Sequence, residues 1–476
     1  MYCLYRFSLV VVMKIVLIRC GETREGETNV TGCYPPLGLA YLAAELQRLK
    51  VDVSIIDAEV LGLGHSALLS HIPAEVDLIG FTATTLAWPS TRHAAERVKA
   101  TFPNALLIIG GPQVTAFPED TLRASLFDLG VLGDGEPTLV ELVTRMSAGG
   151  DIFDVPGCVV RTEDDVQING CIPWIDDLDT IPFPALELLP MERYRCVMVE
   201  EPFVSMITSR GCPYRCDFCS QIYCGGTLRS RSAENIVDEI AHWIERYGAK
   251  EIVLFDETFG VKKQVALRVC ELIQERGLKI RWNARTRINL LDRELLIAMR
   301  RAGCYALHLG IESGTDRVLE MMNKKITTHA IEEAVALARE LGFQTHAYFM
   351  IGYPGETRGE ISETLRFSRR LRLDWASFTI TIPSPETPLY KRAVQDGVLR
   401  ADYWKDHTFG REPKDCIFFT SEACSVTCLQ RMKRQAYIRF YMRPGVLVRN
   451  VLFFVRRGGV RRVMVAMGLL FREGFR

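Results

Sequence analysis

Three cysteines lie close together in one short segment with regular gaps. Cys212, Cys216 and Cys219 stand in Arg210-Gly-Cys-Pro-Tyr-Arg-Cys-Asp-Phe-Cys, where three residues and then two residues separate them. Thiolates at this spacing suit three irons of a [4Fe–4S] cluster, because such clusters are held by cysteine sulfur and are usually closed by a fourth cysteine. The fourth iron would stay open to a ligand. The spacing therefore predicts a cluster that does chemistry rather than one that only carries electrons.

Two other interpretations of the triplet stay open. Cys-x2-Cys pairs are also typical of structural zinc sites, but the nearest further cysteine, Cys224, makes an irregular set of four. The other interpretation is a group of simple buried thiols. A second cluster on Cys416, Cys424 and Cys428 is not favoured, because gaps of seven and three residues fit no common ligation pattern.

The triplet resembles the signature of the radical S-adenosylmethionine (SAM) enzymes. In that family the open iron binds the amino and carboxylate groups of SAM, and one electron cleaves SAM to a 5′-deoxyadenosyl radical. The resemblance implies a [4Fe–4S] cluster and SAM as cofactors, and a flavodoxin-type or ferredoxin-type electron donor. Phe218, before the last cysteine, resembles the aromatic residue that the family packs near the SAM adenine. The alternative is an ordinary core phenylalanine.

The elements that must position the triplet alternate between strand and helix patterns. Six strand-like runs lie at residues 204–208, 251–255, 279–283, 305–310, 344–351 and 375–382. This alternation predicts a parallel (β/α)6 open barrel, which also matches the radical SAM fold. The cysteine loop follows the first run, on the carboxyl-end face where barrel enzymes place their chemistry.

Polar residues at the ends of the next runs are candidates to bind SAM. They are Asp256, Thr258, Asn283, Arg285, Arg287, Glu312 and Ser313. Asp256 and Thr258 suit the methionine ammonium or the ribose hydroxyls of SAM. Asn283, Arg285 and Arg287 suit its carboxylate. Glu312 and Ser313 suit its ribose. Each of them is also open to interpretation as a structural ion pair.

Two later segments resemble family motifs at the end of the barrel. Gly352-Tyr-Pro-Gly-Glu-Thr is interpreted as a turn and a helix start rather than as catalytic machinery. Pro383-Ser-Pro-Glu-Thr-Pro-Leu-Tyr departs from the family, since Glu386 stands where glycine is usual. Contacts to the substrate are not predicted from this segment.

The first third of the chain also alternates between strands and helices. Strand-like runs lie at residues 14–19, 51–57, 77–83, 105–110 and 129–132, with helical patterns such as 37–50 and 90–100 between them. Five such units predict a parallel doubly wound sheet of the Rossmann-like kind. Ligands of such sheets lie beyond the carboxyl ends of the strands, where this chain has glycine-rich loops.

These residues resemble the cobalamin-binding domain attached to many radical SAM enzymes. The matching segments are Tyr34-Pro-Pro-Leu-Gly-Leu-Ala-Tyr-Leu, Gly80-Phe-Thr-Ala-Thr-Thr, Gly110-Gly-Pro-Gln and Gly133-Asp-Gly-Glu. The resemblance implies cobalamin contacts from Thr82, Thr85, Gly110, Gly111, Pro112, Gly133, Gly135 and Glu136. Asp57-Ala-Glu-Val lacks the histidine of the cobalt-ligating Asp-x-His-x-x-Gly pattern, and Gln113 stands where relatives often carry histidine. We therefore expect no histidine below the cobalt.

The length of 476 residues predicts two or three domains. The expected divisions are an N-terminal extension (1–13), a cobalamin-binding domain (14–148), a proline-rich linker without regular elements (149–200), a radical SAM domain (201–395) and a helical basic C-terminal region (396–476). Fifteen cysteines, an odd number without disulfide-like spacing, favour a reducing cytoplasm. The N-terminal apolar run is interrupted by Lys14, so we expect no signal peptide, and Met13 is an alternative start.

Basic residues are concentrated at the C-terminal end. Residues 431–476 carry twelve Arg or Lys and one acid, Glu473, so this segment has a charge of +11 within a chain of zero net charge. Apolar residues alternate with arginine pairs, as in a helix that lies on an anionic membrane surface. The alternative is a basic helix packed on its own domain. Nucleic acid is not an expected partner, because no aromatic stacking platform accompanies the charge.

Together these features predict a cytoplasmic, cobalamin-dependent radical SAM enzyme, with peripheral contact to the inner membrane surface as an open alternative. The leading reaction is methylation of an unactivated carbon in a small, hydrophobic or lipid-like molecule. The alternative within the family is an oxidative cyclase of the anaerobic magnesium-protoporphyrin IX monomethyl ester type. A non-catalytic iron–sulfur or cobalamin sensor is the alternative from another class, and it would not need the polar residues at the strand ends.

Overall fold

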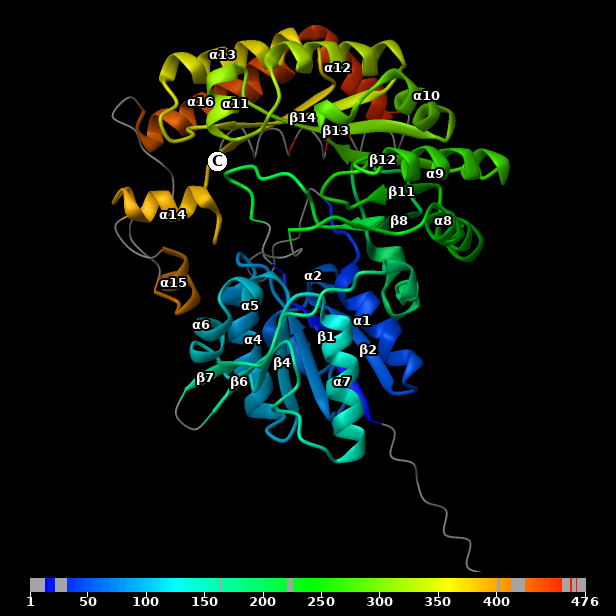
Figure 1. Cartoon of the computed structure of the whole chain (residues 1–476), viewed down its shortest axis with the longest axis vertical. Coiled ribbons are helices and arrows are strands. Elements are labelled where there is room, and N and C mark those ends of the chain that lie inside the picture. The colour runs from blue at the N-terminus through cyan, green and yellow to red at the C-terminus, as the bar shows by residue number, and fades with distance from the viewer. Residues whose placement is uncertain are drawn as a thin grey trace, which may run out of the picture. The chain divides into compact units, whose positions relative to one another are not determined.

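The computed structural model describes residues 13–21, 32–162, 165–220, 226–399, 403–411, 424–455, 463, 464 and 468. The chain divides into two compact units (Figure 1). The first unit contains Met1–Thr28, Pro36–Ile175 and Ile181–Arg193, and the second contains Asn29–Pro35, Asp176–Thr180 and Tyr194–Arg476. Within the described residues, no helix has both the length and the apolar character needed to cross a membrane.

The first unit is built on a sheet with the order β2-β1-β3-β4-β5-β6-β7. Its strands are β1 (Lys14–Arg19), β2 (Asp52–Asp57), β3 (Leu78–Thr82), β4 (Leu106–Gly110), β5 (Leu129–Val131), β6 (Cys158–Arg161) and β7 (Val166–Ile168). Its helices are α1 (Leu37–Arg48), α2 (Ala58–Leu61), α3 (His65–Leu69), α4 (Trp88–Thr101), α5 (Pro112–Ala116), α6 (Pro118–Arg123) and α7 (Gly135–Ala148). The strands β1 to β5 are parallel, so the predicted doubly wound sheet is confirmed.

The segment expected to be an irregular linker contributes two strands to this sheet. β6 pairs antiparallel with β5, and β7 pairs antiparallel with β6. The expectation that prolines exclude regular structure here was wrong, because Pro156 and Pro173 flank this hairpin and do not interrupt it. The Cys158-Val-Val run then buries its side chains against the sheet.

The second unit contains a six-stranded parallel sheet with the order β15-β14-β13-β12-β11-β8. Its strands are β8 (Phe203–Met206), β11 (Glu251–Leu254), β12 (Arg281–Thr286), β13 (Cys304–Glu312), β14 (Gln344–Ile351) and β15 (Trp375–Ile380), with a separate ribbon of β9 (Ser209–Arg210) and β10 (Arg229–Ser230). Its helices are α8 (Ala233–Tyr247), α9 (Lys263–Glu275), α10 (Arg293–Arg301), α11 (Asp316–Met321), α12 (Thr328–Glu340), α13 (Arg358–Arg370), α14 (Pro388–Gln395), α15 (Tyr403–Thr408) and α16 (Val426–Tyr441). The predicted (β/α)6 partial barrel is confirmed.

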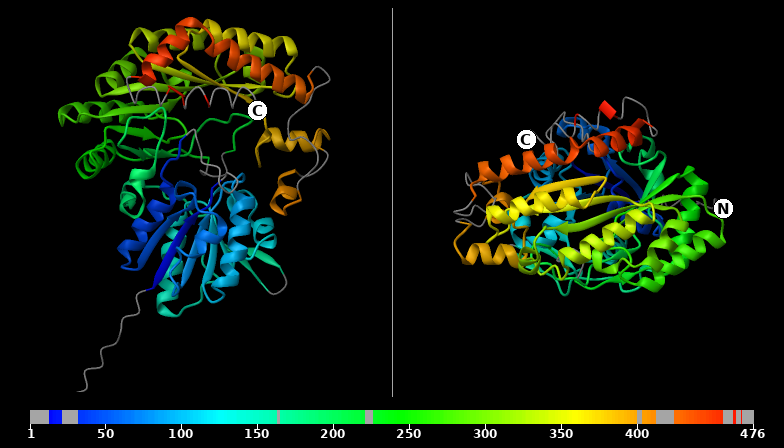
Figure 2. Two further views of the ribbon diagram at one scale, coloured as in Figure 1. Left: turned by 180° about the vertical axis from the view of Figure 1, so that it is seen from behind. Right: turned by 90° about the horizontal axis from the view of Figure 1, so that it is seen from above.

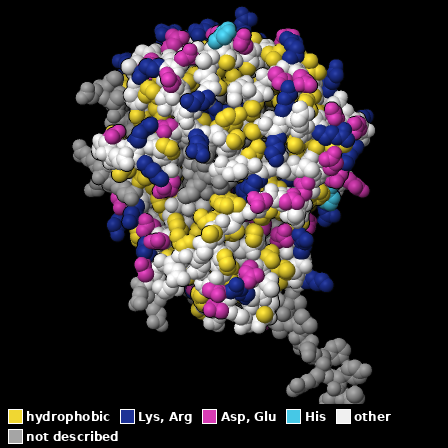
Figure 3. All heavy atoms as spheres, in the orientation of Figure 1, with side chains coloured by type: hydrophobic (Ala, Val, Ile, Leu, Met, Phe, Trp, Pro, Cys, Tyr) yellow, Lys and Arg dark blue, Asp and Glu magenta, His cyan; other side chains and the backbone are white. Residues whose placement is uncertain are grey.

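The helices that connect the strands lie on one face of this sheet, as Figure 2 shows from two further directions. Side chains of β14 alternate, so that Thr345, Ala347, Phe349 and Ile351 are buried, while the residues between them are partly exposed. The partly exposed residues therefore line the concave face of the half-barrel. On the face drawn in Figure 3, Lys or Arg and Asp or Glu side chains are interspersed.

The outermost strand β15 is closed by side chains of α16. The backbone N–H of Phe378 donates to the Tyr437 hydroxyl at 3.2 Å, and the N–H of Ala376 donates to the Tyr441 hydroxyl at 3.1 Å. The Tyr441 hydroxyl in turn donates to the carbonyl of Ala376 at 2.9 Å. Because tyrosines four residues apart share one helix face, α16 satisfies backbone groups that an open sheet edge would leave unpaired.

Candidate active site

The cysteine loop follows β9 at the carboxyl end of the first barrel strand. Cys216 is buried, Cys212 is half-buried and Cys219 is exposed. The backbone N–H of Cys219 donates to the carbonyl of Cys216 at 3.1 Å, which closes a tight turn around the Cys-x2-Cys pair. No three Cys, His, Asp or Glu side chains in the described part of the chain are grouped to share a single metal ion. A [4Fe–4S] cluster has a different requirement, since each thiolate binds its own iron.

Asp217, between the second and third cysteines, anchors the loop to the barrel. Its carboxylate accepts a hydrogen bond from the Tyr353 hydroxyl at 2.5 Å and another from the Arg392 guanidinium. Its backbone N–H donates to the carbonyl of Met322 at 3.0 Å, and its carbonyl accepts from the N–H of Leu389 at 3.1 Å. Sequence reasoning missed this set, because these partners are far from the cysteines along the chain.

Arg287 contacts the cysteine loop through its guanidinium. One N–H donates to the sulfur of Cys216 at 3.1 Å, and the guanidinium lies 3.9 Å from the ring centre of Tyr214. Another N–H donates to the carbonyl of Lys324 at 2.5 Å. A hydrogen bond from a cation to a cluster sulfur complements the negative charge of a thiolate-ligated cluster and tunes its reduction potential.

Glu312 forms a buried ion pair beside Phe218. The Lys324 ammonium lies 2.7 Å from a carboxylate oxygen of Glu312 and 5.7 Å from the ring centre of Phe218. Glu312 has a positive φ of 67°, and a Cβ on Gly310 would lie 2.7 Å from the same carboxylate. Only glycine fits at position 310 without displacing this pair. Lys324 was not predicted as a site residue, although it contacts Glu312 and Phe218, which were both predicted to bind SAM.

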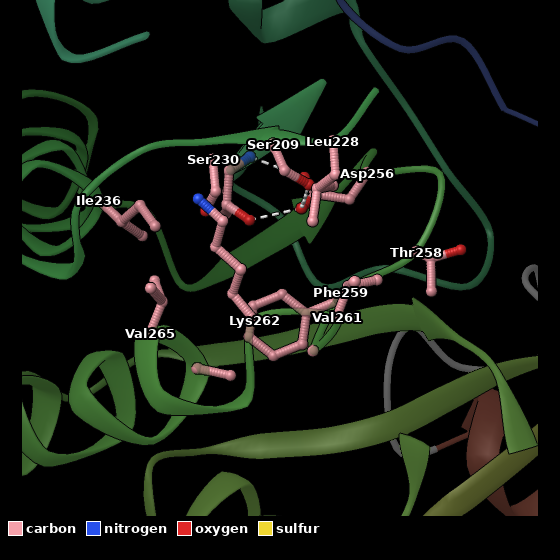
Figure 4. Close-up of a pocket in the computed structure, with 13 residues that line it drawn as sticks. Ser209, Leu228, Ser230, Ile236, Asp256, Thr258, Phe259, Val261, Lys262 and Val265 are labelled. Carbon is pink, nitrogen blue, oxygen red and sulfur yellow. Dashed lines mark hydrogen bonds between the residues drawn. The ribbon is translucent and has the colours of Figure 1, made fainter. Parts of the chain in front are cut away.

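Asp256 links the ends of the first two barrel strands. Its carboxylate accepts hydrogen bonds from the Thr208 N–H at 2.6 Å and the Ser209 hydroxyl at 2.7 Å, and burial raises the pKa of the carboxyl. Figure 4 shows these contacts at the wall of a small pocket that Lys262 also lines. Thr258 lies beside the cysteine loop, since its hydroxyl oxygen is 3.7 Å from the sulfur of Cys212. Contact of both residues with SAM stays a prediction.

The other predicted SAM contacts lie in different surroundings. The Asn283 amide donates to Glu251 at 3.3 Å, at the amino end of β11, so this contact does not direct it toward the cysteine loop. The Ser313 hydroxyl lies 3.2 Å from that of Thr364, in the barrel wall. The guanidinium of Arg285 stacks on Phe255, 4.6 Å from the ring centre. Of these three residues, Arg285 alone is partly exposed, while Asn283 and Ser313 are buried.

The concave face carries a polar set that sequence reasoning missed. Arg285, His308 and His346 are neighbours in register on β12, β13 and β14. His308 Nδ1 lies 2.9 Å from the Tyr348 hydroxyl, and His346 Nε2 lies 2.9 Å from the Ser377 hydroxyl. The alternation of polar and apolar residues in His346-Ala-Tyr-Phe was the available signal.

Both histidines of this set are neutral at pH 7. Burial lowers the pKa of His308 well below its usual value, and the neighbouring His346 and Arg285 disfavour its protonation further. Burial and then Arg285 lower the pKa of His346 to about 4. His346 Nδ1 and Gln344 Oε1 are buried and have no hydrogen-bond partner within the described structure. Leaving such atoms unsatisfied costs roughly 1–3 kcal/mol each, so this face is prepared for a ligand or for water.

In the first unit, the predicted cobalamin residues lie together at the carboxyl edge of β3, β4 and β5. Thr82 ends β3, Gly110 ends β4, and Pro112 begins α5, while Gly135 and Glu136 begin α7. Thr85 follows β3, Gly111 lies between β4 and α5, and Gly133 follows β5. The structure therefore brings the predicted cobalamin set to one sheet edge, next to the change in strand order between β1 and β3, where such sheets bind ligands.

Two glycines explain how this edge fits a large flat ligand such as cobalamin. A Cβ on Gly111 would lie 2.7 Å from the Thr82 hydroxyl oxygen, and its φ is 93°, so the turn into α5 depends on glycine. A Cβ on Gly110 would meet no atom closer than 3.9 Å, which leaves space beyond the strand end. The residues at this sheet edge therefore fit cobalamin.

The side chains of Asp57 and Gln113, the two positions considered for cobalt ligation, have partners within the first unit. The Asp57 carboxylate is fully buried and holds Arg19 by two hydrogen bonds of 2.9 and 2.6 Å. The side chain of Gln113 is buried and donates to the Thr121 hydroxyl at 3.3 Å. Neither side chain is positioned as a metal ligand.

Comparison with known proteins identifies both units. The model of the radical SAM superfamily matches residues 206–368, and the model of the B12-binding domain matches residues 27–143.

An uncharacterised methyltransferase of Pyrococcus horikoshii is 36% identical over 462 residues, which cover 95% of this chain and 99% of the relative. The anaerobic magnesium-protoporphyrin IX monomethyl ester cyclase of Cereibacter sphaeroides is 31% identical over 83% of this chain and 65% of its own length. The structure of the radical SAM methyltransferase TsrM from Kitasatospora setae, with cobalamin and a [4Fe–4S] cluster bound, aligns with a TM-score of 0.69 at 20% identity over 82% of this chain and 80% of that chain.

Proposed function

The chain belongs to the radical SAM superfamily, in the branch that carries a B12-binding domain, and we propose that it methylates an unactivated carbon of a small molecule. One observation carries the proposal. The same chain holds a three-thiol loop at the carboxyl end of a half-barrel and a glycine-lined sheet edge that fits cobalamin. When bound, the cluster with SAM supplies a 5′-deoxyadenosyl radical, and cobalamin supplies a methyl group. We assign these cofactors to residues 201–395 and 14–148, respectively.

The residues of this chain would hold and orient the reactants. Cys212, Cys216 and Cys219 would ligate the cluster, and Asp217 and Arg287 keep their loop in place. Glu312, held by Lys324 next to Phe218, is the described carboxylate best placed to accept hydrogen bonds from the SAM ribose. Among the predicted SAM contacts, we propose that the residues near the cysteine loop bind SAM rather than Asn283 and Ser313.

The polar set of the concave face is the proposed contact surface for the substrate. Two neutral imidazoles, the Tyr348 hydroxyl and the Arg285 guanidinium supply hydrogen-bonding groups there. Such a surface suits a molecule with an oxygen function, such as a carbonyl or a carboxylate, attached to an apolar skeleton. We expect His346→Phe to lower the yield of product per SAM cleaved, while His346→Asn retains part of it.

Isotope labelling tests the reaction. The anaerobically reconstituted enzyme, supplied with cobalamin, a reductant and SAM with a trideuterated methyl group, is incubated with extracts of small molecules. The proposal expects a product heavier by one labelled methyl group, together with equal amounts of 5′-deoxyadenosine and S-adenosylhomocysteine. Turnover without label in the product would reject methylation.

The alternative reaction is oxidative cyclisation, which the cyclase of Cereibacter sphaeroides at 31% identity supports. It predicts 5′-deoxyadenosine without S-adenosylhomocysteine, and a product without label. The two coproducts therefore separate the alternatives in the same experiment. A non-catalytic sensor would form neither product above the background of SAM cleavage.

We also propose a flavodoxin-type or ferredoxin-type donor for the electron that SAM cleavage consumes. The enzyme is proposed to work in the cytoplasm and, for a lipid-like substrate, at the inner membrane surface. The support for this location is the basic C-terminal region, because Lys and Arg near an anionic leaflet contribute roughly 1 kcal/mol each.

A further inference from the structure

After α16 a further helix at residues 444–455 has two contrasting faces. Val446, Asn450 and Phe454 are buried at a spacing of four residues. Val448, Leu452 and Val455 are 56%, 48% and 44% exposed, at the i, i+4 and i+7 spacing of one helix face. We call these three residues the C-terminal apolar stripe.

The orientation of the stripe is fixed by contacts to the barrel. Arg449 lies 3.2 Å from the Asp374 carboxylate and also donates to the carbonyl of Leu373 at 3.2 Å. Phe453 packs edge-on against Trp375, with ring centres 4.9 Å apart. Just before the helix, Arg443 donates to the carbonyl of Arg369 at 2.6 Å. These contacts hold the opposite face of the helix, so they keep the stripe turned away from the barrel.

The charge around the stripe has one sign. Residues 424–455 contain six Arg or Lys and no Asp or Glu, and Arg456-Arg457 follow Val455 directly in the chain. Arg431 and Arg439 are exposed on α16, which Figure 2 shows along the outer surface of the second unit. The sequence alone left open whether the region packs on its own domain or lies on a membrane. The structure shows that one face of this helix packs on the second unit, whereas the stripe is exposed.

We propose that the C-terminal apolar stripe docks on an anionic lipid surface. Apolar side chains on a helix rich in Arg enter the boundary between headgroups and acyl chains, and the arginines contact the phosphates. A second copy of the chain is a poorer occupant, because symmetric pairing would bring two basic segments together. The inference rests on the peripheral location under the proposed function and not on the reaction. Docking would place the barrel at the surface from which a lipid-like substrate is drawn.

Vesicle flotation of the full chain tests the inference without turnover, so a failed methylation assay leaves its result untouched. We expect the protein to float with phosphatidylglycerol vesicles and to stay behind with phosphatidylcholine vesicles. The double variant V448S/L452S should reduce the floated fraction about fivefold or more, since it removes apolar area that the membrane would bury. Leu126→Ser, at a 50% exposed leucine of the first unit, is the matched control and should float like the parent protein.

Circular dichroism and thermal unfolding establish that both variants are folded. Equal flotation of V448S/L452S and the parent protein would overturn the proposal, and so would equal binding to the two kinds of vesicle. Concentration-dependent dimers that V448S/L452S abolishes, without flotation of the parent, would assign the stripe to a second copy instead.

Discussion

The hydroxyl of Tyr353 lies 2.5 Å from the carboxylate of Asp217, although the two residues are 136 positions apart in the chain. Burial and the neighbouring Asp217 raise the pKa of Tyr353, so the hydroxyl stays protonated and donates. Asp217 stands inside the Cys-x2-Cys turn. This contact therefore joins the cysteine loop to the segment that follows β14, on the far side of the sheet order from β8.

Tyr353→Phe should loosen this connection. The variant removes a hydrogen bond to a buried carboxylate, so the free energy of unfolding should fall by roughly 1–3 kcal/mol, and less iron and sulfide should be retained after reconstitution. Urea unfolding and iron analysis measure the two effects. Tyr247→Phe is the control, since its buried hydroxyl has no hydrogen-bond partner in the described structure and its removal should be nearly neutral. Equal loss in both variants would contradict a specific role of the Tyr353 contact.

Arg287→Ala should weaken cluster retention more than it weakens the fold. The guanidinium contacts the Cys216 sulfur and the Tyr214 ring, and loss of such outer partners typically costs about 10- to 100-fold in metal affinity. Iron content after desalting and the visible spectrum measure the effect. Arg293→Ala, which removes an exposed pair with Glu340, is the control. Full cluster retention in Arg287→Ala would show that the cysteine loop does not depend on this cation.

Glu356 should make stability fall as pH rises. Burial raises the pKa of Glu356 to about 7 from the ordinary 4.5, although the N–H groups of Tyr353 and Gly352 oppose the shift. Between pH 4.5 and pH 7 the folded chain holds a proton that the unfolded chain has lost. The free energy of unfolding should therefore fall as the pH rises from about 4.5 to about 7, by up to about 3 kcal/mol in total. Glu356→Gln keeps an acceptor for both N–H groups and should flatten the profile. Urea unfolding at about pH 5 and about pH 8 checks this, and an unchanged slope would contradict it.

Tyr437→Phe and Tyr441→Phe should each expose part of the β15 edge. Each variant leaves backbone groups of Phe378 or Ala376 without their side-chain partner, and we expect a loss of roughly 1–2 kcal/mol per site. Hydrogen exchange at these two amides measures the opening directly. The Tyr247→Phe variant again provides the reference, and unchanged exchange at residues 376 and 378 would contradict the capping role.

Gly111→Ala tests the cobalamin edge. The new Cβ would meet the Thr82 hydroxyl oxygen at 2.7 Å in a backbone conformation that favours glycine, so the turn between β4 and α5 must shift. We expect lower retention of hydroxocobalamin after desalting and an unchanged cluster spectrum, because the cysteine loop lies in the other unit. Gly62→Ala, at a glycine that also has a positive φ but has no atom near its Cβ, is the control. Equal retention of hydroxocobalamin by Gly111→Ala and Gly62→Ala would contradict the assigned role of the β4 turn.

Much of the fold was predictable because runs of strand length alternate regularly with helical patterns along the chain. The runs at residues 14–19 and 344–351 match β1 and β14, and the other predicted strands differ from the observed ones by a few residues at their ends. Gly352-Tyr-Pro-Gly-Glu-Thr is confirmed as a turn and helix start, since Glu356 accepts from the turn N–H groups and Thr357 caps α13. The β6–β7 hairpin was missed because proline content was weighed without regard to where the prolines fall.

The sequence by itself determined the cysteine triplet and the glycine-rich loops, because their chemistry depends on residue type and on spacing over a few positions. Tertiary structure decided which distant side chains support them. Tyr353 and Arg392 reach Asp217, Arg287 reaches Cys216, and Lys324 reaches Glu312 only after the parallel strands have aligned their carboxyl ends. Tertiary structure also decided which side of the helix at residues 444–455 is buried. The sequence does not distinguish its basic residues, whereas in the structure Arg449 forms an ion pair with Asp374. Contacts between residues so far apart in the chain depend on strand order and register, which local sequence patterns do not encode.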